Sequence, residues 1–371
     1  MTNRMKERPS GLRRGFTLVE LLVVIAVVAL LIGVLLPALG EAQKTAWQIG
    51  ASAIQRDLAN GVHGYAGEQS STQLPGGNSE RSLSLLNTQL FKGSARFYAR
   101  LDSSSAPVQS VDWITPAVGA DVMPDELAAR WWYILEELAD PAMRERSPVY
   151  AEGDATTFEL LTQYAVDKGQ QYRGVSYLMP SVWQWYHLSA QQISALGRNG
   201  AANFQRRTID GQPIGEFVRM IGPDAFGSTN QVRPTSKYNP WLTAIDNPSA
   251  KIAFASGHRY FDSNGVDFDA SWSIGPGGYA GTYGAFTSSG PLFDGSTAYG
   301  ENSPSNGQQL PLSYRHNNKI VAAFWDGHVE SIAREDSFDP ALWTPSGWEF
   351  VGGTGTVEQA FEYYEPGDRI N

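Results

Sequence analysis

The 371-residue chain contains no cysteine, so no disulfide can stabilise it and no thiol can act in catalysis. It also lacks phosphate-binding glycine loops, serine nucleophile elbows, paired metal-binding histidines and zinc spacings. These absences favour a protein that is not an enzyme and that needs no cofactor.

Positive charge is in short supply, with 28 Lys and Arg residues against 38 Asp and Glu residues and a formal net charge of -10. Because an acidic protein is repelled by the phosphates of nucleic acids, we expect no nucleic-acid partner. Aromatic residues make up 12% of the chain. This content and the chain length favour a folded protein with a sizeable core over a disordered one.

A segment near the N-terminus has no polar side chain from Leu21 to Leu36. A helix from Phe16 to Leu36 would be about 31 Å long, which is enough to cross a bilayer. Basic residues cluster before it, at Arg4, Lys6, Arg8, Arg13 and Arg14. Because basic residues stay on the cytoplasmic side, we expect a single-pass protein of the inner membrane with a cytoplasmic N-terminus and an exported C-terminal part.

One carboxylate, Glu20, lies inside the apolar block that begins at Phe16. An acid in a lipid-buried helix costs up to about 3 kcal/mol, so Glu20 is a candidate functional residue.

The sequence Gly15-Phe16-Thr17-Leu18-Val19-Glu20 resembles the N-terminal signal of type IV prepilins and type II secretion pseudopilins. The resemblance implies that a prepilin peptidase cuts between Gly15 and Phe16 and that Phe16 becomes the N-methylated first residue. It also implies that Glu20 guides assembly, by pairing with the free amine of a neighbouring subunit. Pro37 falls where the family has its helix-kinking proline. An ordinary secretory signal would need a small-x-small cleavage site, and residues 37–40 form a poor one.

We predict three parts: a removed leader at 1–15, an N-terminal helix at 16–66 and an extracytoplasmic globular domain at 67–371. The helix would span the membrane over 16–36 and be amphipathic over 37–66. Its predicted apolar stripe comprises Leu39, Ala46, Trp47, Ile54, Leu58, Val62 and Tyr65. Its predicted polar positions are Gln48, Gln55, Arg56, Asp57 and Asn60. The fold class is α+β and pilin-like, with the helix packed on an antiparallel β-sheet.

Within the globular domain, periodicity predicts helices over 124–139 and 156–166, the second capped by Thr156, and a third over 189–196. Residues 176–187 look extended, and 252–255 look like a buried strand. The Gly- and Ser-rich composition of residues 275–309 predicts a long segment without regular secondary structure.

Residues 312–333 predict a β-hairpin, because Asp326-Gly327 suits a two-residue type I′ turn. That turn would place Trp325 opposite His328, Phe324 opposite Val329 and Val321 opposite Ile332. The same segment resembles a large prepilin-like family marked by a histidine, nine residues and Asp-Gly, here His316 and Asp326-Gly327. Residues 247–255 also resemble that family, although Ser256-Gly257 stands where its strand commonly ends in Asp.

We interpret His316 and Asp326 as structural, because about 33 Å of strand would separate them. His328, beside the turn, could hydrogen-bond to Asp326.

Two further sites are hypotheses. Oxygen ligands at Asp262, Asn264, Asp267 and Asp269 suit either a calcium site, which pseudopilins often carry, or a polar turn; their spacing does not match an EF-hand. Trp183 and Trp185 suit either an aromatic sugar-binding platform or packing in the core. We interpret the pair Trp131-Trp132 as residues of the core and its boundary rather than as a ligand site.

The sequence therefore predicts a structural subunit of a type II secretion or type IV pilus-like filament. Its partners would be a prepilin peptidase, other pilin-like subunits, an inner-membrane assembly platform and membrane lipid. The alternatives are an anchored or filament-tip protein that binds a substrate or glycan and, third, a membrane-anchored hydrolase.

Overall fold

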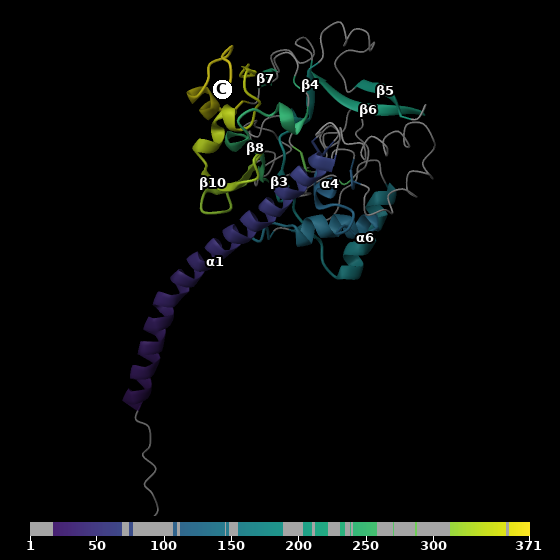
Figure 1. Ribbon diagram of the computed structural model, residues 1–371. Coiled ribbons are helices and arrows are strands. Elements are labelled where there is room, and N and C mark those ends of the chain that lie inside the picture. The colour runs from purple at the N-terminus through teal and green to yellow at the C-terminus, as the bar shows by residue number, and fades with distance from the viewer. Residues whose placement is uncertain are drawn as a thin grey trace, which may run out of the picture. The chain divides into compact units, whose positions relative to one another are not determined.

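The computed structural model describes residues 18–68, 74–76, 107–109, 112–144, 146–147, 155–187, 203–209, 212–221, 231–233, 238, 240–257, 270, 286–287, 312–353 and 356–371. The chain divides into two compact units, Met1–Ala46 and Trp47–Asn371. Figure 1 labels the main helices and strands.

The first described element is helix α1, Leu18–Glu68, which confirms the long N-terminal helix predicted from the sequence (Figure 1). Among the described residues it is the one helix that is long and apolar enough to cross a membrane, with a mean hydropathy of 3.2 over its most apolar window. Within the first unit its large apolar side chains are exposed. Leu39, which we placed on the amphipathic stripe, is 66% exposed in the single chain.

Within the second unit, α1 buries one side of its last five turns. The buried residues are Ala51, Gln55, Leu58, Ala59, Val62, Tyr65 and Ala66, which recur at helical spacing. The stripe is therefore confirmed at Leu58, Val62 and Tyr65. Gln55, predicted to be on the polar face, is buried instead.

The main sheet of the second unit has four antiparallel strands in the order β10-β9-β8-β3. These are β10 (Val329–Ala333), β9 (Lys319–Phe324), β8 (Ile252–Ser256) and β3 (Tyr177–Leu178). Every residue of β8 is buried, as its unbroken run of apolar and small residues predicts for a central strand. The predicted strand over 252–255 is confirmed.

The β9–β10 hairpin exists, but its predicted register is wrong by one residue. Val329 pairs with Ala323, and Ser331 pairs with Val321. The connection is a three-residue loop in which the Gly327 N–H donates to the Phe324 carbonyl (2.9 Å) and the Phe324 N–H to the His328 carbonyl (2.9 Å). Gly327 has φ 91°, and Asp326 lacks the positive φ that a type I′ turn requires. Phe324 therefore faces His328, and their rings stack with centroids 4.1 Å apart.

A turn with two positive φ angles lies at the other end of β9. Asn317 has φ 54° and Asn318 has φ 60°, and the Lys319 N–H donates to the His316 carbonyl at 3.1 Å. Asparagine tolerates this left-handed region better than most residues do. The pair Asn317-Asn318 thus sets the entry into β9, immediately after His316.

The helical region beside the sheet contains α4 (Ile114–Val118), α5 (Leu127–Trp132) and a π-helix over Tyr133–Glu137. The predicted helix over 124–139 is confirmed with shorter bounds and with its second half in π geometry. Helix α6 (Ala155–Lys168) confirms the helix predicted from residue 156. Its start at Ala155 places Thr156 inside the helix, so the predicted Thr156 cap is wrong.

The remaining strands form three small sheets. Strand β1 (Arg146–Ser147) pairs with β2 (Tyr172–Arg173), and β7 (Val232–Arg233) pairs with β11 (Glu349–Phe350). Strand β6 (Gln212–Ile221) lies between β5 (Asn203–Ile209), which is antiparallel to it, and β4 (Trp185–His187), which is parallel. A 3₁₀ turn at Ser181–Gln184 interrupts the extended segment predicted over 176–187.

Further 3₁₀ turns lie at Leu242–Ala244, Pro248–Ala250, Asp336–Phe338, Pro340–Leu342 and Glu358–Glu362. The predicted helix over 189–196 lies outside the described residues. Of the segment 275–309, Phe286 and Thr287 are described, and Thr287 forms an isolated bridge with Met179.

Tryptophans dominate the core of the second unit. The fully buried ones are Trp113, Trp131, Trp183, Trp325, Trp343 and Trp348. Trp113 packs on Phe254 of β8 with ring centroids 4.4 Å apart, and its indole N–H donates to the Phe286 carbonyl at 2.7 Å. Because each such ring removes a large apolar area from water, this cluster holds the helical region and the sheet together.

Candidate functional site

The N-terminal candidate site is described from Leu18 onward. Glu20 lies in the first turn of α1 and is surrounded in sequence by exposed apolar residues, including Val19 (68% exposed) and Leu21 (57%). The next acid along the chain is Glu41. Gly15 and Phe16, the predicted cleavage and methylation residues, lie outside the described residues. An acid at the start of an apolar helix is suited to meet a cation near a membrane boundary.

Pro37 lies inside α1, as the sequence predicts. Because proline has no N–H, the carbonyl of Gly33 lacks its usual helical partner. Gly33 has no atom within 4 Å of the position that a Cβ would take, apart from the helix itself. The Gly33–Pro37 turn is therefore the point of α1 where bending costs least.

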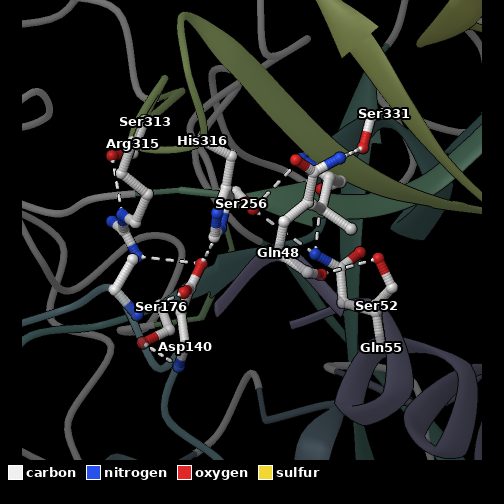
Figure 2. Close-up of polar contacts among 12 residues, drawn as sticks. Gln48, Ser52, Gln55, Asp140, Ser176, Ser256, Ser313, Arg315, His316 and Ser331 are labelled. Carbon is white, nitrogen blue, oxygen red and sulfur yellow. Dashed lines mark hydrogen bonds and ion pairs between the residues drawn. The ribbon is translucent and has the colours of Figure 1, made fainter. Parts of the chain in front are cut away.

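A second candidate site lies inside the second unit, where Asp140, Arg315 and His316 converge (Figure 2). The Oδ2 atom of Asp140 is 2.8 Å from Nε2 of His316 and 3.5 Å from Nη1 of Arg315. The side chains of Asp140 and His316 are 0% and 1% exposed. Two segments far apart in sequence, one after the π-helix and one before β9, therefore meet through a buried charged contact.

A hydroxyl group and a backbone N–H form the other hydrogen bonds of Asp140. Its N–H donates to the Ser176 hydroxyl at 3.0 Å, and its Oδ1 accepts from the Ala142 N–H at 2.8 Å. Burial alone would raise the pKa of Asp140, but the hydrogen bond from His316 and the positive charge of Arg315 hold the pKa below its usual value. Asp140 is therefore a carboxylate at neutral pH.

The structure does not bring His316 and Asp326 together. Each has its own partner, because Asp326 accepts from the His328 N–H at 3.1 Å and from the His328 ring. Burial alone would raise the pKa of Asp326, but the hydrogen bonds from the His328 N–H and ring, together with the charge of that ring, hold the pKa below its usual value. The hydrogen bond expected between His328 and Asp326 is confirmed.

Sequence reasoning missed Asp140 as the partner of His316. The sequence indicated only that a partner is needed. A histidine at the entrance of a buried strand requires a hydrogen-bond partner, and a carboxylate is a common one. Nothing in the local spacing connects residue 140 with residue 316, since the contact depends on the tertiary fold.

Side-chain hydrogen bonds also join α1 to the sheet. Gln48 donates to the Ser331 hydroxyl at 2.6 Å, and Gln55 donates to the Val321 carbonyl at 2.8 Å (Figure 2). Ser256 of β8 lies 3.5 Å from the same Gln55 amide. The buried position of Gln55 follows from these bonds, which let a polar side chain enter the core.

The hypothesis of a sugar platform at Trp183 is wrong. Trp183 is fully buried, donates its indole N–H to the Ile252 carbonyl at 3.0 Å and contacts Trp325 edge to face. Core packing, the alternative that we gave, is its role. The Trp185 side chain lies outside the described residues. Trp131 is buried and Trp132 is partly buried, as predicted for core and boundary.

The calcium hypothesis concerns Asp262, Asn264, Asp267 and Asp269, all of which lie outside the described residues. Within the described part of the chain, no group of three or more His, Cys, Asp or Glu residues is arranged to hold a metal ion.

Comparison with protein families identifies the prokaryotic N-terminal methylation motif at residues 12–36. No curated protein and no solved structure matches the chain significantly. The motif and the long apolar helix fit a prepilin-like protein that is anchored in a membrane. More narrowly, the motif supports a protein similar to type IV pilins and pseudopilins.

Proposed function

We propose that the protein is a structural subunit of a type II secretion or type IV pilus-like filament. The observation that carries this proposal is the methylation motif at residues 12–36, in which Glu20 is placed at the start of a long apolar helix. A prepilin peptidase would cut between Gly15 and Phe16 and methylate the new terminus. The subunit would then wait in the inner membrane, with its second unit outside the cytoplasm.

Assembly would depend on charge pairing inside the membrane. The new amine at Phe16 is positive, and Glu20 of an adjacent subunit is negative. In a medium of low dielectric constant, such a pair stabilises the joined state far more than it would in water. Pairing at this point would also fix the axial position of each subunit as it leaves the inner-membrane assembly platform.

A second candidate is an adhesive or substrate-capturing protein, at a filament tip or anchored singly. It is favoured by the size of the second unit, Trp47–Asn371, which is large for the main subunit of a filament. The number of copies per filament distinguishes the two: many copies support the body role, and a few at one end support the tip role.

Mass spectrometry of the protein extracted from native membranes tests the processing step. We expect a mature chain that begins at Phe16 and carries one additional methyl group on its terminal amine. A chain that retains Met1–Gly15, or that is cut beyond Leu36, would remove the filament proposal and leave an anchored or secreted binding protein.

A Glu20→Gln variant tests the assembly step. The amide is neutral and cannot attract the amine, so we expect the variant to be cleaved normally but to enter filaments at least tenfold less than the natural protein. Glu41→Gln is the matched control, because Glu41 is exposed on the same helix and pairs with Lys44 at 2.8 Å. Fractionation of sheared filaments, with immunoblotting, measures both. Equal incorporation of the two variants would contradict the charge-pairing step.

A further inference from the structure

The tip of the β9–β10 hairpin contains a chemically fragile dipeptide. Asp326 is followed directly by Gly327, and the Asp326 side chain is 35% exposed. Because glycine has no side chain to shield its backbone nitrogen, the nitrogen of an Asp-Gly pair can attack the Cγ atom of the aspartate. The exposed tip is therefore a place where the backbone can change covalently unless the fold prevents it.

The reaction consumes nothing but water. The Gly327 nitrogen loses its proton and forms a bond to Cγ of Asp326, one carboxyl oxygen leaves as water, and a cyclic succinimide results. Hydrolysis then returns one water to the ring. Opening at Cγ restores aspartate, whereas opening at the backbone carbonyl leaves the chain running through Cβ, which is isoaspartate.

The turn itself requires both residues of the fragile pair. Gly327 has φ 91°, in the left-handed region that favours glycine. The Asp326 carboxylate accepts from the His328 N–H at 3.1 Å, a local bond for which aspartate is well suited. Replacing either residue would weaken the turn, so protection has to come from the surroundings.

Steric cover at the tip is slight. Among the described residues beyond its chain neighbours, one side chain comes within 4 Å of the position that a Cβ on Gly327 would take. It is His63 of α1, whose Nε2 lies at 3.9 Å, an ordinary contact distance. His328, on the other side of the glycine, is 39% exposed. The tip touches α1 without being enclosed by it.

Hydrogen bonds hold both reacting groups instead. The Gly327 N–H, which would have to lose its proton, donates to the Phe324 carbonyl at 2.9 Å. The Asp326 carboxylate also accepts from Nδ1 of the His328 ring at 2.5 Å. That ring is stacked on Phe324 with centroids 4.1 Å apart, so its orientation is fixed by packing.

The same contacts keep the carboxyl group unreactive. Although burial alone would raise the pKa of Asp326, its hydrogen bonds with His328 hold that pKa below the usual value. An ionised carboxylate repels a nucleophile and loses an oxygen far less readily than a neutral carboxyl group does. The bonds therefore restrain the aspartate both by position and by charge.

We propose that Asp326-Gly327 is a site of spontaneous isoaspartate formation that the folded hairpin suppresses, with the ring of His328 as the positioning residue. The ring holds the carboxylate, and the bond to Phe324 holds the nitrogen. Modification is then confined to chains whose hairpin tip is open. Isoaspartate lengthens the backbone between the two residues by one carbon, so a modified chain could not rebuild the same turn.

The natural protein provides the first test. Full-length protein in detergent micelles and the same chain in denaturant are incubated at neutral pH, and isoaspartate is located by peptide mapping with electron-transfer fragmentation. Because the reaction needs an open tip, we expect Asp326 to isomerise at least about tenfold more slowly in the folded chain. Equal rates in the two samples would overturn the proposal.

The denatured sample contains its own reference. The sequence has two further pairs of the same kind, Asp210-Gly211 and Asp294-Gly295. In denaturant all three aspartates should isomerise at similar rates. If Asp326 were the slow one even there, its protection would come from the local sequence and not from the fold, which would also contradict the proposal.

Variants then test the role of His328. His328→Ala keeps the backbone bond but removes the ring, and we expect Asp326 to isomerise about fivefold faster in the folded protein, as suits the loss of a part-exposed charged contact. His328→Asn, whose amide can donate from a similar position, should restore much of the protection. Glu330→Gln is the matched control, because Glu330 lies 4.0 Å from the other ring nitrogen and should leave the rate unchanged.

Substitution of His63 separates bonding from cover. His63→Ala removes the side chain of α1 that is nearest to Gly327 and should leave the isomerisation rate as it is. Faster isomerisation in His63→Ala, with no change in His328→Ala, would assign the protection to the helix and overturn the role of His328. The comparison of folded with denatured natural protein decides the site itself even if a variant fails to fold.

Discussion

Gly61→Ala is expected to destabilise the second unit strongly, because helix α1 contacts α4 through this glycine. A Cβ added at Gly61 would lie 2.0 Å from the carbonyl oxygen of Ala117 and 2.7 Å from its carbonyl carbon. These are backbone atoms that cannot rotate away, so α1 would have to move off the core. Overpacking of this kind costs typically about 1–3 kcal/mol, and occasionally more; we expect the upper end.

Gly64→Ala is the matched control for this prediction. Gly64 lies one turn further along the same helix and has no atom within 4 Å of its added Cβ, apart from the helix itself. Both substitutions gain the same helix propensity, so Gly64→Ala should stabilise by roughly 0.5–1 kcal/mol. Denaturant unfolding of the full chain in micelles, followed by tryptophan fluorescence, measures both. Equal effects would show that α1 does not pack closely on Ala117 in solution.

The elements that the sequence predicts well are those set by local pattern. The apolar run of α1 and the buried run of β8 each have a length and periodicity that few other structures satisfy. The helical regions were found for the same reason, with bounds that differ by a few residues. The α+β class and the antiparallel sheet followed from these elements and from the prepilin-like signal.

The features that sequence reasoning missed depend on tertiary contacts. Gln55 has the polarity of an exposed residue, and it is buried because Val321 and Ser256 offer it hydrogen-bond partners. The hairpin register was wrong because Asp-Gly fits both a two-residue and a three-residue loop. In the three-residue form, the backbone N–H of Trp325 donates to the Lys251 carbonyl at 3.0 Å. No local sequence pattern predicts a hydrogen bond of this kind.

The same limit applies to the candidate sites. The cleavage signal, Glu20 and Pro37 are contiguous in sequence, so a motif could identify them. The contact between His316 and Asp140 joins residues that are 176 positions apart, and it emerges when the chain is folded. Sequence alone therefore predicted a structural role for His316 without its partner.

Asp140→Asn is expected to produce the second large loss of stability. The amide keeps the shape and can still accept from the Ala142 N–H, but it removes the negative charge between His316 and Arg315. His316 can change tautomer to accept from the amide, whereas Arg315 is left as a buried cation without its counter-charge. Removing one partner of a buried ion pair costs about 3–5 kcal/mol. Asp326→Asn is the control: the Asp326 side chain is 35% exposed, and the solvent-screened pair that it forms with His328 should contribute far less.

The pH dependence of unfolding separates the loss of charge from a simple packing defect. The folded-state pKa of Asp140 is lowered, so its contribution to stability is present above the ordinary carboxyl pKa of 3.8 and is lost as the pH falls through the folded value. As the pH falls below about 4, the natural protein should therefore lose the part of its unfolding free energy that the ionised Asp140 contributes. The Asp140→Asn variant should not show this loss. If the difference in unfolding free energy between the two proteins stays constant down to the lowest pH at which both fold, the contact stabilises by shape alone. If this difference in unfolding free energy instead becomes smaller as the pH falls, the ionised Asp140 carboxylate is the group that holds the segment before β9 to the helical region.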